Sequence, residues 1–172
     1  KPLVPVCGVP MLDYVVTHCH RYGFHRVIVN AHYLPEQIQS WADSQTSDVE
    51  VYVSVELPEI LGTGGGLKMV SAHLAESVIV LNGDVLCDVN LTAIREAIPD
   101  AGAVMVLRPH RQDAEEKYGI VATDSEQCVV DLKKMAITKP VGQTRWDSHF
   151  TGIHGLKRVV LNRVPDGFGC IV

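Results

Sequence analysis

The amino-acid sequence predicts an α/β protein: a mixed, mostly parallel sheet between two layers of helices, with a smaller strand-rich part. Short apolar segments alternate with helical patterns over the first hundred residues, which favours right-handed strand–helix–strand crossovers and parallel strands. The run Val78–Leu81 is solidly aliphatic and ends at Asn82-Gly83-Asp84, which is typical of a strand buried on both faces. After residue 108 the signals become strand-rich and hairpin-like.

Length, composition and charge exclude several classes of protein. The 172 residues suffice for one well-cored domain and are few for two. Hydrophobic residues make up 47% and charged residues 20%, which indicates a globular chain and not a disordered one. A net charge of −5 without a Lys/Arg cluster argues against a nucleic-acid surface. With no apolar run near the roughly 18 residues of a membrane span and no secretory-signal pattern, we expect a cytoplasmic protein without a membrane partner.

The cysteines and histidines do not predict a metal site. The five cysteines show no CxxC spacing and leave an odd thiol, which fits a reducing compartment and buried thiols. His18 and His20 flank Cys19, but side chains two apart on a helix point about 200° away from each other. A shared metal ion is therefore disfavoured. The chain begins inside a loop-like, proline-rich segment and ends soon after another loop at Pro165–Gly169, so we expect it to be truncated at both ends.

Cap and turn residues divide the first part of the chain into elements. The expected order is a helix through Leu12–Cys19, a strand at Arg26–Asn30, a helix from Pro35 through Trp41, a strand at Val49–Val55, a short helical pattern after the glycines at 62–66, the strand Val78–Leu81, a helix from Asn90 to Ile98 and a strand at Ala103–Leu107. Pro10 and Pro35 suit the first turn of a helix, and Gly23 suits the position after its end. We expect Asn90 to cap the later helix and Pro99 to stop it.

The second part of the chain predicts paired short strands. Residues 108–117 are strongly polar and predict a loop, and residues 133–148 show no clear periodicity. The segments Tyr118–Val121 and Cys128–Leu132 predict a hairpin around a polar turn at Asp124–Gln127. A last strand is expected at Phe150–His154, with a short helix near Lys157–Leu161.

The glycine run at 62–66 leaves two interpretations open. It lacks the spacing of a Walker A phosphate loop, since Lys68 is followed by Met69, and it lacks the dinucleotide fingerprint, since Leu67 stands where a glycine is needed. Glycines at a helix start allow close approach of a ligand to free N–H groups. The alternative is a turn that only closes a strand–helix connection.

Two charged residues are candidates for phosphate chemistry. Asp84 follows the carboxyl end of a predicted buried strand, the edge at which open α/β sheets bind ligands. Mg²⁺ prefers one or two carboxylates together with phosphate oxygens, whereas the alternative is a turn aspartate that bonds its own backbone. Asp88 can support such a site or cap the next helix. Lys1 can provide a point charge for phosphate, or it is a solvated lysine.

Five motifs in order resemble those of the sugar-phosphate nucleotidylyltransferase (NDP-sugar pyrophosphorylase) family. They are KPLVPVCGVP at 1–10, LGTGGGL at 61–67, NGDVLCDVNL at 82–91, YGIV at 118–121 and FTGIH at 150–154. The sequence is most similar to the short branch that includes mannose-1-phosphate guanylyltransferases and N-acetylmuramate-1-phosphate uridylyltransferases. The resemblance implies a Rossmann-like fold with a small sugar-binding lobe. Residues 1–172 would be a single nucleotidyltransferase domain, with 1–108 as the nucleotide-binding part and 109–172 as the sugar-phosphate-binding part.

The resemblance also implies an activity and its residues. The reaction would be NTP plus sugar 1-phosphate to NDP-sugar plus pyrophosphate, with GTP or UTP favoured and a cell-wall or glycan precursor as product. Lys1 and Asp84 would be catalytic, and Asp84 would bind Mg²⁺. The implied nucleotide-binding residues are Gly62, Thr63, Gly64 and Gly65; the implied sugar-phosphate-binding residues are Gly119, Lys139, Thr151 and Gly152. Glu56 matches a commonly present acid, whose role could be structural.

The chain departs from the family pattern in three places. The glycine-rich signature loop with Thr-Arg is expected immediately before Lys1, and a second metal-binding aspartate is expected beyond residue 172. The family's Glu-Lys-Pro is Thr138-Lys139-Pro140 here, and spacing from Tyr118 would nominate Lys134 instead of Lys139. The alternative function is a catalytically inactive pyrophosphorylase-like domain kept for binding or regulation. A homo-oligomer is left open.

Overall fold

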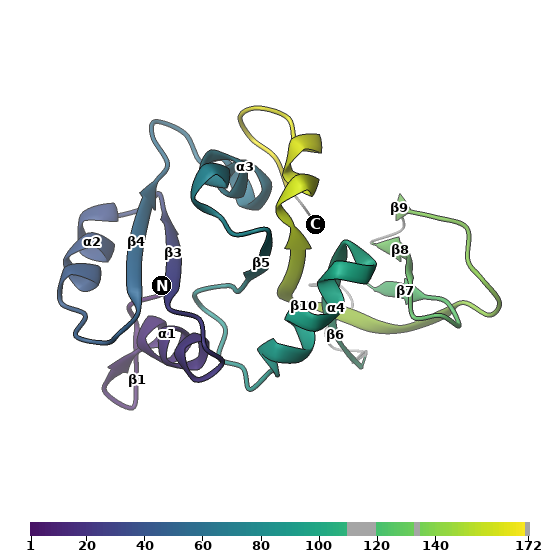
Figure 1. Ribbon diagram of the computed structural model, residues 1–172, viewed down its shortest axis with the longest axis horizontal. Helices are drawn as coiled ribbons and strands as arrows, with labels where there is room; N and C mark the ends of the chain where they lie inside the picture. The colour runs from purple at the N-terminus through teal and green to yellow at the C-terminus, as the bar shows by residue number, and fades with distance from the viewer. Residues whose placement is uncertain (110–119, 133–134, 171–172) are drawn as a thin grey trace. The chain divides into compact units, whose positions relative to one another are not determined.

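The computed structural model describes residues 1–109, 120–132 and 135–170, and these residues form two compact units (Figure 1). The larger unit comprises Lys1–Val104 and the chain from Gly155 onward, and the smaller unit comprises Met105–His154. The unit boundaries thus differ from a division at residue 108, because the chain returns to the larger unit after His154. The binding role of each part stays a prediction.

The order of elements follows the predicted alternation of strands and helices. In chain order they are β1 (Pro5–Val6), β2 (Val9–Pro10), α1 (Met11–Arg21), β3 (Arg26–Ala31), α2 (Pro35–Asp43), β4 (Glu50–Val55), α3 (Gly62–Met69), the 3₁₀ helix η1 (Ser71–His73), β5 (Ser77–Val80), α4 (Leu91–Ala101), β6 (Ala103–Pro109), β7 (Val121–Thr123), β8 (Val129–Leu132), β9 (Met135–Ala136), β10 (Arg145–Lys157) and the 3₁₀ helix η3 (Arg158–Arg163). The predicted mixed α/β class is confirmed.

Within the described residues the strands form three sheets, which include both parallel and antiparallel pairs. β3 and β4 are parallel, in register from Arg26 opposite Glu50 to Ala31 opposite Val55. A second sheet runs in the order β5-β10-β7-β8-β9, with β6 beside β10. The pairs β10–β7, β7–β8 and β8–β9 are antiparallel, as is the small hairpin β1–β2.

One core of the larger unit lies between β3, β4 and the helices α1 and α2, which flank these strands in Figure 1. Its buried members are Leu12, Val15 and Val16 of α1, Val29 and Ala31 of β3, Ile38 and Trp41 of α2, and Val49. The predicted inner faces of both helices are therefore confirmed. Gly23 ends the α1 region with a left-handed φ of +77°, as expected for the residue after a helix.

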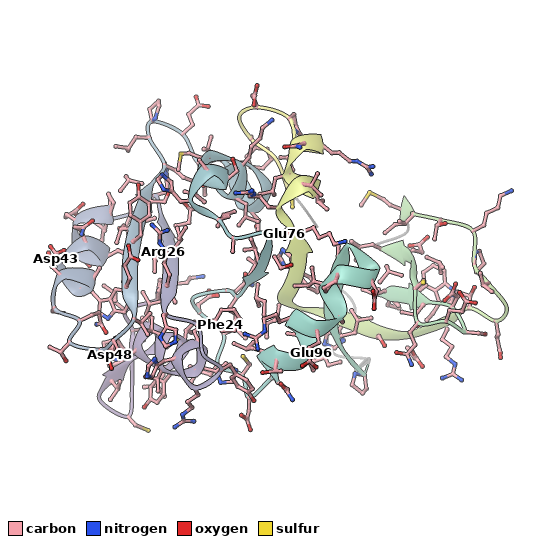
Figure 2. The ribbon with its side chains drawn as sticks, viewed as in Figure 1. Phe24, Arg26, Asp43, Asp48, Glu76 and Glu96 are labelled. Carbon is pink, nitrogen blue, oxygen red and sulfur yellow. The ribbon has the colours of Figure 1, made fainter. Side chains whose placement is uncertain are left out.

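The Arg95 guanidinium of α4 lies 5.7 Å from the ring centroid of Phe24, which is labelled in Figure 2.

The prediction that Pro99 stops its helix is wrong. Asn90 caps α4 as expected, with its Oδ1 accepting from Ala93 N at 3.1 Å, but the helix continues through Pro99 to Ala101. The proline lies near the helix end, so its missing donor removes only a late intrahelical bond. Burial of the apolar face, with Ile98 at 0% exposure, outweighs that loss. Gly102, at φ +77°, ends α4 and donates to Ile98 O at 2.8 Å.

The prediction that Val78–Leu81 is buried on both faces is also wrong in degree. β5 forms at this position, but all four of its residues, 77–80, are half-buried. The reason is its place in the sheet: among the described residues β5 is an edge strand, hydrogen-bonded only to β10.

The smaller unit contains a hairpin near the predicted one, but its first strand is β7 (Val121–Thr123) and not Tyr118–Val121, of which Tyr118 and Gly119 lie outside the described residues. β7 and β8 pair around a turn that Asp124 organises by accepting from the N–H groups of Glu126 (3.0 Å), Cys128 (2.9 Å) and Val141 (2.9 Å). These donors, that of Val141 first, lower the pKa of Asp124. The predicted polar loop at 108–117 falls largely outside the described residues. β10 is longer than the predicted strand at 150–154, and the predicted final helix is the 3₁₀ helix η3.

The cysteines and the helix lengths can be compared with what the composition predicted. The expectation of buried thiols holds for Cys19, whose pKa burial raises to about 11. It is wrong for Cys7, Cys128 and Cys170, which are exposed. In the part of the chain that the structure describes, every helix is too short or too polar to span a bilayer.

Candidate active site

The turn after β5 lies beside the first loop of the chain. Val85 N donates to Asn82 O at 3.2 Å, which closes the turn around Gly83. A Cβ at Gly83 would lie 3.5 Å from Cβ and Cγ of Pro2, so the Pro2 ring is in van der Waals contact with this turn. Lys1 and Asp84 each adjoin that contact. The first loop of the chain and the carboxyl end of β5 therefore meet at the same edge.

Backbone hydrogen bonds hold the Lys1 loop against the start of α1. Lys1 O accepts from Val4 N at 2.9 Å, Pro2 O accepts from Leu12 N at 3.0 Å, and Val4 O accepts from Met11 N at 3.1 Å. Lys1 itself is exposed. Its ammonium group is thus a solvated cation on a fixed backbone, which suits contact with a charged ligand.

The Asp84 carboxylate has no hydrogen-bond or ion-pair partner among the described residues, and it is exposed. The alternative of a turn aspartate that bonds its own backbone is therefore not what this turn shows. Oxygen donors of this kind fit Mg²⁺, which is held by one or two carboxylates with substrate phosphates supplying further oxygens. In the described ranges no three His, Cys, Asp or Glu side chains cluster so as to hold a metal ion by themselves.

The glycine run does not precede a helix as expected but forms the first turns of α3, and this glycine turn is closed by the chain itself. Gly169 O accepts from Gly64 N at 2.8 Å and from Gly65 N at 3.1 Å, and Gly169 N donates to Leu61 O at 2.9 Å. The expectation of free N–H groups is thus wrong for Gly64 and Gly65. The N–H groups of Gly62 and Thr63 make no hydrogen bond within the described residues. Binding of a base or ribose by this turn stays a prediction, now centred on those two groups.

Close packing explains why this turn needs glycines. A Cβ on Gly62 or Gly64 would come within 2.9 Å of Gly169 O, and one on Gly65 would overlap Gly167 O. A Cβ on Gly66 would lie 2.5 Å from Glu56 Oε1 and 2.6 Å from Asn30 Nδ2. Gly62 also has a left-handed φ of +70°, which glycine adopts without strain.

Lys68 belongs to this packing and not to a phosphate loop. Its Nζ donates to Val164 O at 2.5 Å and pairs with Asp166 Oδ1 at 2.8 Å. The hydrogen bond from Lys68, together with its charge, lowers the pKa of Asp166. Both contacts tie the segment 164–169 to α3.

Glu56 is the residue whose importance the sequence showed least. It follows β4 directly, is 1% exposed, and accepts from Asn30 Nδ2 at 2.6 Å and from Leu61 N at 2.8 Å. The signal that could have found this pair is topological: Asn30 and Glu56 lie at the carboxyl ends of two neighbouring parallel strands. The contact with Gly169, more than a hundred residues away from the glycine run, has no such signal.

The sugar-phosphate candidates lie in the smaller unit. Thr151 Oγ1 donates to Val106 O at 2.8 Å and accepts from Ile153 N at 3.3 Å, so its hydroxyl is engaged by backbone. Gly152 has a left-handed φ of +86°, and Lys139 is exposed. Gly119 and Lys134 fall outside the described residues. The sugar-phosphate role of all five stays a prediction.

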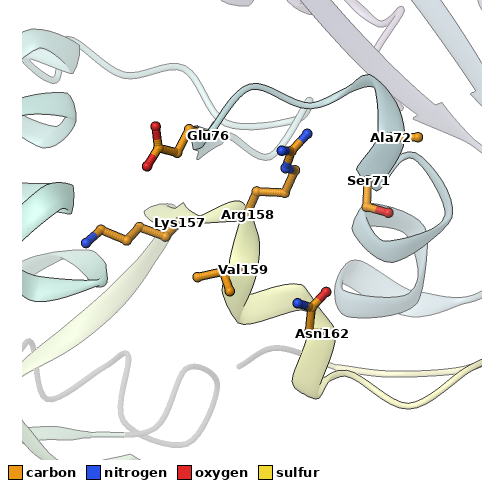
Figure 3. Close-up of a pocket in the computed structure, with 7 residues that line it drawn as sticks. All are labelled: Ser71, Ala72, Glu76, Lys157, Arg158, Val159 and Asn162. Carbon is orange, nitrogen blue, oxygen red and sulfur yellow. The ribbon is translucent and has the colours of Figure 1, made fainter.

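A pocket of about 450 Å³ opens elsewhere in the larger unit, between the η1–β5 segment and the start of η3 (Figure 3). Ser71, Glu76, Lys157, Arg158 and Asn162 are among the residues that line it. One guanidinium nitrogen of Arg158 already donates a hydrogen bond within the protein, to Leu74 O at 2.9 Å. None of the predicted site residues lines this pocket.

Comparison with known proteins identifies the family. A family model described as nucleotidyl transferase matches residues 1–163. The chain therefore belongs to the nucleotidyl transferase family, and the resemblance drawn from its motifs is confirmed.

The chain is similar to enzymes that act on sugar 1-phosphates. It is 29% identical to a mannose-1-phosphate guanylyltransferase of Mycobacterium tuberculosis over 97% of this chain and 45% of that protein. It is 25% identical to a UTP–glucose-1-phosphate uridylyltransferase of Synechocystis over 97% of this chain and 46% of that protein. The chain thus spans less than half the length of these two relatives.

A solved structure shares the fold. HddC from Yersinia pseudotuberculosis, in a crystal structure complexed with GMP-PN, has a TM-score of 0.75 and 22% identity, covering 98% of this chain and 72% of that chain. The Rossmann-like fold class predicted from the motifs is confirmed by such neighbours.

Proposed function

We propose that the protein is a sugar-1-phosphate nucleotidyltransferase, which joins an NTP and a sugar 1-phosphate to an NDP-sugar and releases pyrophosphate. The observation that carries this proposal is the exposed Asp84 carboxylate, which has no partner among the described residues. The turn that holds it lies near the Lys1 loop, since a Cβ on Gly83 would lie 3.5 Å from the Pro2 ring. The names of the relatives support the reaction class, and they include both a guanylyltransferase and a uridylyltransferase, so GTP and UTP are both proposed as the nucleotide. The reaction belongs to nucleotide-sugar biosynthesis in the cytoplasm.

The chemistry makes modest demands on the protein. An oxygen of the sugar 1-phosphate attacks the α-phosphorus in line, the bond from that phosphorus to the β-bridging oxygen breaks, and pyrophosphate leaves with the electron pair. No general base is needed, because a phosphate monoester with a second pKa near 6 is mostly dianionic at neutral pH. The protein must hold two anions that repel each other and stabilise the charge of the transition state.

The residues of the candidate site divide this work. Lys1, on a loop fixed against α1, supplies a cation that offsets the repulsion between the two anions. Asp84 would hold Mg²⁺, which when bound supplies charge neutralisation at the phosphate oxygens. The N–H groups of Gly62 and Thr63 are the donors of the α3 turn that remain for the nucleotide. Lys139, Thr151, Gly152 and Gly119 are proposed for the sugar phosphate.

The test is turnover of the full-length protein. Pyrophosphate release is measured with each NTP against a panel of sugar 1-phosphates, with and without Mg²⁺. The proposal predicts Mg²⁺-dependent release with at least one pair. The alternative, a domain kept for binding or regulation, predicts no turnover with any pair and unchanged nucleotide binding in Asp84→Asn.

A further inference from the structure

The larger unit contains a buried carboxylate that the proposed chemistry does not use. Glu56 is 1% exposed, and no Lys, Arg or His side chain forms an ion pair with it in the part of the chain that the structure describes. A carboxylate without a cation is costly to bury unless hydrogen bonds satisfy it. Each of its two oxygens has such a donor, Asn30 Nδ2 on Oε1 and Leu61 N on Oε2.

The backbone of Glu56 is held as firmly as its side chain. Its N–H donates to Ala31 O at 2.8 Å, which continues the β3–β4 pairing one residue past the strands. Its carbonyl oxygen lies 3.0 Å from His32 Nδ1. The carboxylate therefore projects from a fixed point at the end of the sheet toward the start of α3.

The glycine turn rests on this carboxylate at two points. Leu61 is the N-cap of α3, and its N–H is the group that Glu56 Oε2 accepts. Gly66, one turn into the helix, approaches so closely that a Cβ there would lie 2.5 Å from Glu56 Oε1. The residues between these two points, 62–65, include both N–H groups that remain without a partner among the described residues.

We propose that Glu56 is a positioning residue of the nucleotide subsite. Its carboxylate fixes Leu61 and the first turn of α3 so that the N–H groups of Gly62 and Thr63 keep one orientation toward the nucleotide. This inference rests on the proposed function and deepens it. It assigns Glu56 no contact with substrate: the residue acts through the turn it holds.

Two substitutions separate hydrogen bonding from charge. In Glu56→Gln the amide oxygen can still accept from Leu61 N, and a rotated Asn30 amide can accept from the new NH₂ group. Glu56→Ala removes both acceptors and leaves the half-buried Leu61 N without its acceptor. Asn30→Ala removes the donor on Oε1, so the carboxylate loses one of the two hydrogen bonds that fix its orientation toward Leu61 N. Glu59→Ala is the matched control, because Glu59 is an exposed acid of the same loop.

The experiment measures the dissociation constant of GTP and UTP by calorimetry and KM for each substrate by pyrophosphate release, all on the full-length protein. Loss of a residue that orients a metal ligand typically costs about 10–100-fold in affinity or activity. By analogy, Glu56→Ala should raise Kd and KM for the nucleotide by about that factor. KM for the sugar 1-phosphate should change less than about threefold. Glu56→Gln and Glu59→Ala should stay within about threefold of the wild type, and Asn30→Ala should fall between.

Each other outcome overturns the inference. Unchanged nucleotide affinity in a folded Glu56→Ala variant, or an equal rise of KM for both substrates, indicates a purely structural acid. A loss in Glu56→Gln as large as in Glu56→Ala indicates a role of the charge. If Glu56→Ala does not fold, Asn30→Ala decides: nucleotide affinity equal to the wild type refutes positioning. A wild-type protein that neither binds nor turns over nucleotide refutes the proposed function, and this inference with it.

Discussion

Two glycine-containing turns of the larger unit are in opposite physical situations. In the turn at 61–66 the donors of Leu61, Gly64 and Gly65 are occupied by other parts of the same chain. In the turn at 82–84 the Asp84 carboxylate is exposed and has no partner among the described residues. A dense glycine run thus reflects close packing of the chain, whereas a single unpartnered carboxylate at a sheet edge is a better indication of a ligand.

The largest effect on activity is expected in the turn at 82–84, at Asp84. Asp84→Asn keeps the shape of the side chain and removes the charge, so kcat/KM for pyrophosphate release should fall by about 10² to 10³, the usual cost of losing one group that stabilises transition-state charge. Stability should change by no more than about 0.5 kcal/mol, as for other exposed sites. Initial rates and urea unfolding check both. Asp100→Asn, at an exposed acid of α4 outside the candidate site, is the control, and an equal loss in that variant would contradict a specific role of Asp84.

A buried histidine of the smaller unit, His154, should make the folding stability of the protein depend on pH. The stabilities of variants in the two turns are therefore best compared at a pH where this histidine is neutral in both the folded and the unfolded state. Burial lowers the pKa of His154 from 6.5 to about 4, so the unfolded chain binds the proton more readily than the folded chain between these values. The contribution of His154 to the free energy of unfolding should therefore be fully present above about pH 6.5. It should be lost as the pH decreases toward 4, by roughly 3 kcal/mol in total. Urea unfolding from pH 7.5 to 4.5 measures this slope, and His154→Phe should flatten it. An unchanged slope in that variant would assign the effect to other groups.

Glycine-to-alanine substitution should destabilise the protein in the turn at 61–66 and leave its stability nearly unchanged in the turn at 82–84. Gly65→Ala places a Cβ against Gly167 O and 2.9 Å from the Leu61 Cβ, and overpacking of this kind costs about 1–3 kcal/mol. Gly83→Ala meets only ordinary contacts at 3.5 Å or more, so its free energy of unfolding should stay within about 1 kcal/mol of the wild type. Denaturant unfolding checks the pair. Equal costs would mean that the two turns are packed alike.

The smallest effect on stability is expected at Asp166, an exposed residue of the segment 164–169 that packs on the glycine turn. Asp166→Asn removes the ion pair with Lys68, but the Asp166 side chain is 96% exposed, and exposed pairs contribute little. Because the pKa of Asp166 is lowered, what the pair contributes is present above the unfolded pKa and is lost as the pH falls through the folded pKa. The melting temperature of Asp166→Asn should decrease less than that of Gly65→Ala, and the difference from the wild type should shrink in high salt. A decrease as large as that of Gly65→Ala would contradict this ranking.

The sequence predicted local elements better than distant contacts. Apolar spacing with Pro10 and Pro35 at the starts located α1 and α2, because these signals act within a few residues. Pro99 was misjudged because the burial of Ile98 is a tertiary effect. The carbonyl of Gly169 that closes the glycine turn lies too far along the chain for any local pattern to indicate it.

The candidate site was predictable to a similar degree. The position of Asp84 followed from a strand that ends in a turn, and its meeting with the Lys1 loop is what the structure adds. The role of Glu56 needed the register of β3 and β4, which brings Asn30 to the same sheet edge. The assignment of Gly119 and Lys134 rests on motif resemblance alone, since both lie outside the described residues.

We expect the turn after β5 to provide, through Asp84, the metal-binding carboxylate of a nucleotidyltransferase. The most direct test is pyrophosphate release by the full-length protein as a function of Mg²⁺ concentration, for the wild type and Asp84→Asn in parallel, with a chelator as the zero point. Mg²⁺-dependent release is expected in the wild type. In Asp84→Asn the half-saturating Mg²⁺ concentration should be at least about tenfold higher, and the maximal rate should be lower. Superimposable Mg²⁺ curves for the two proteins would contradict it.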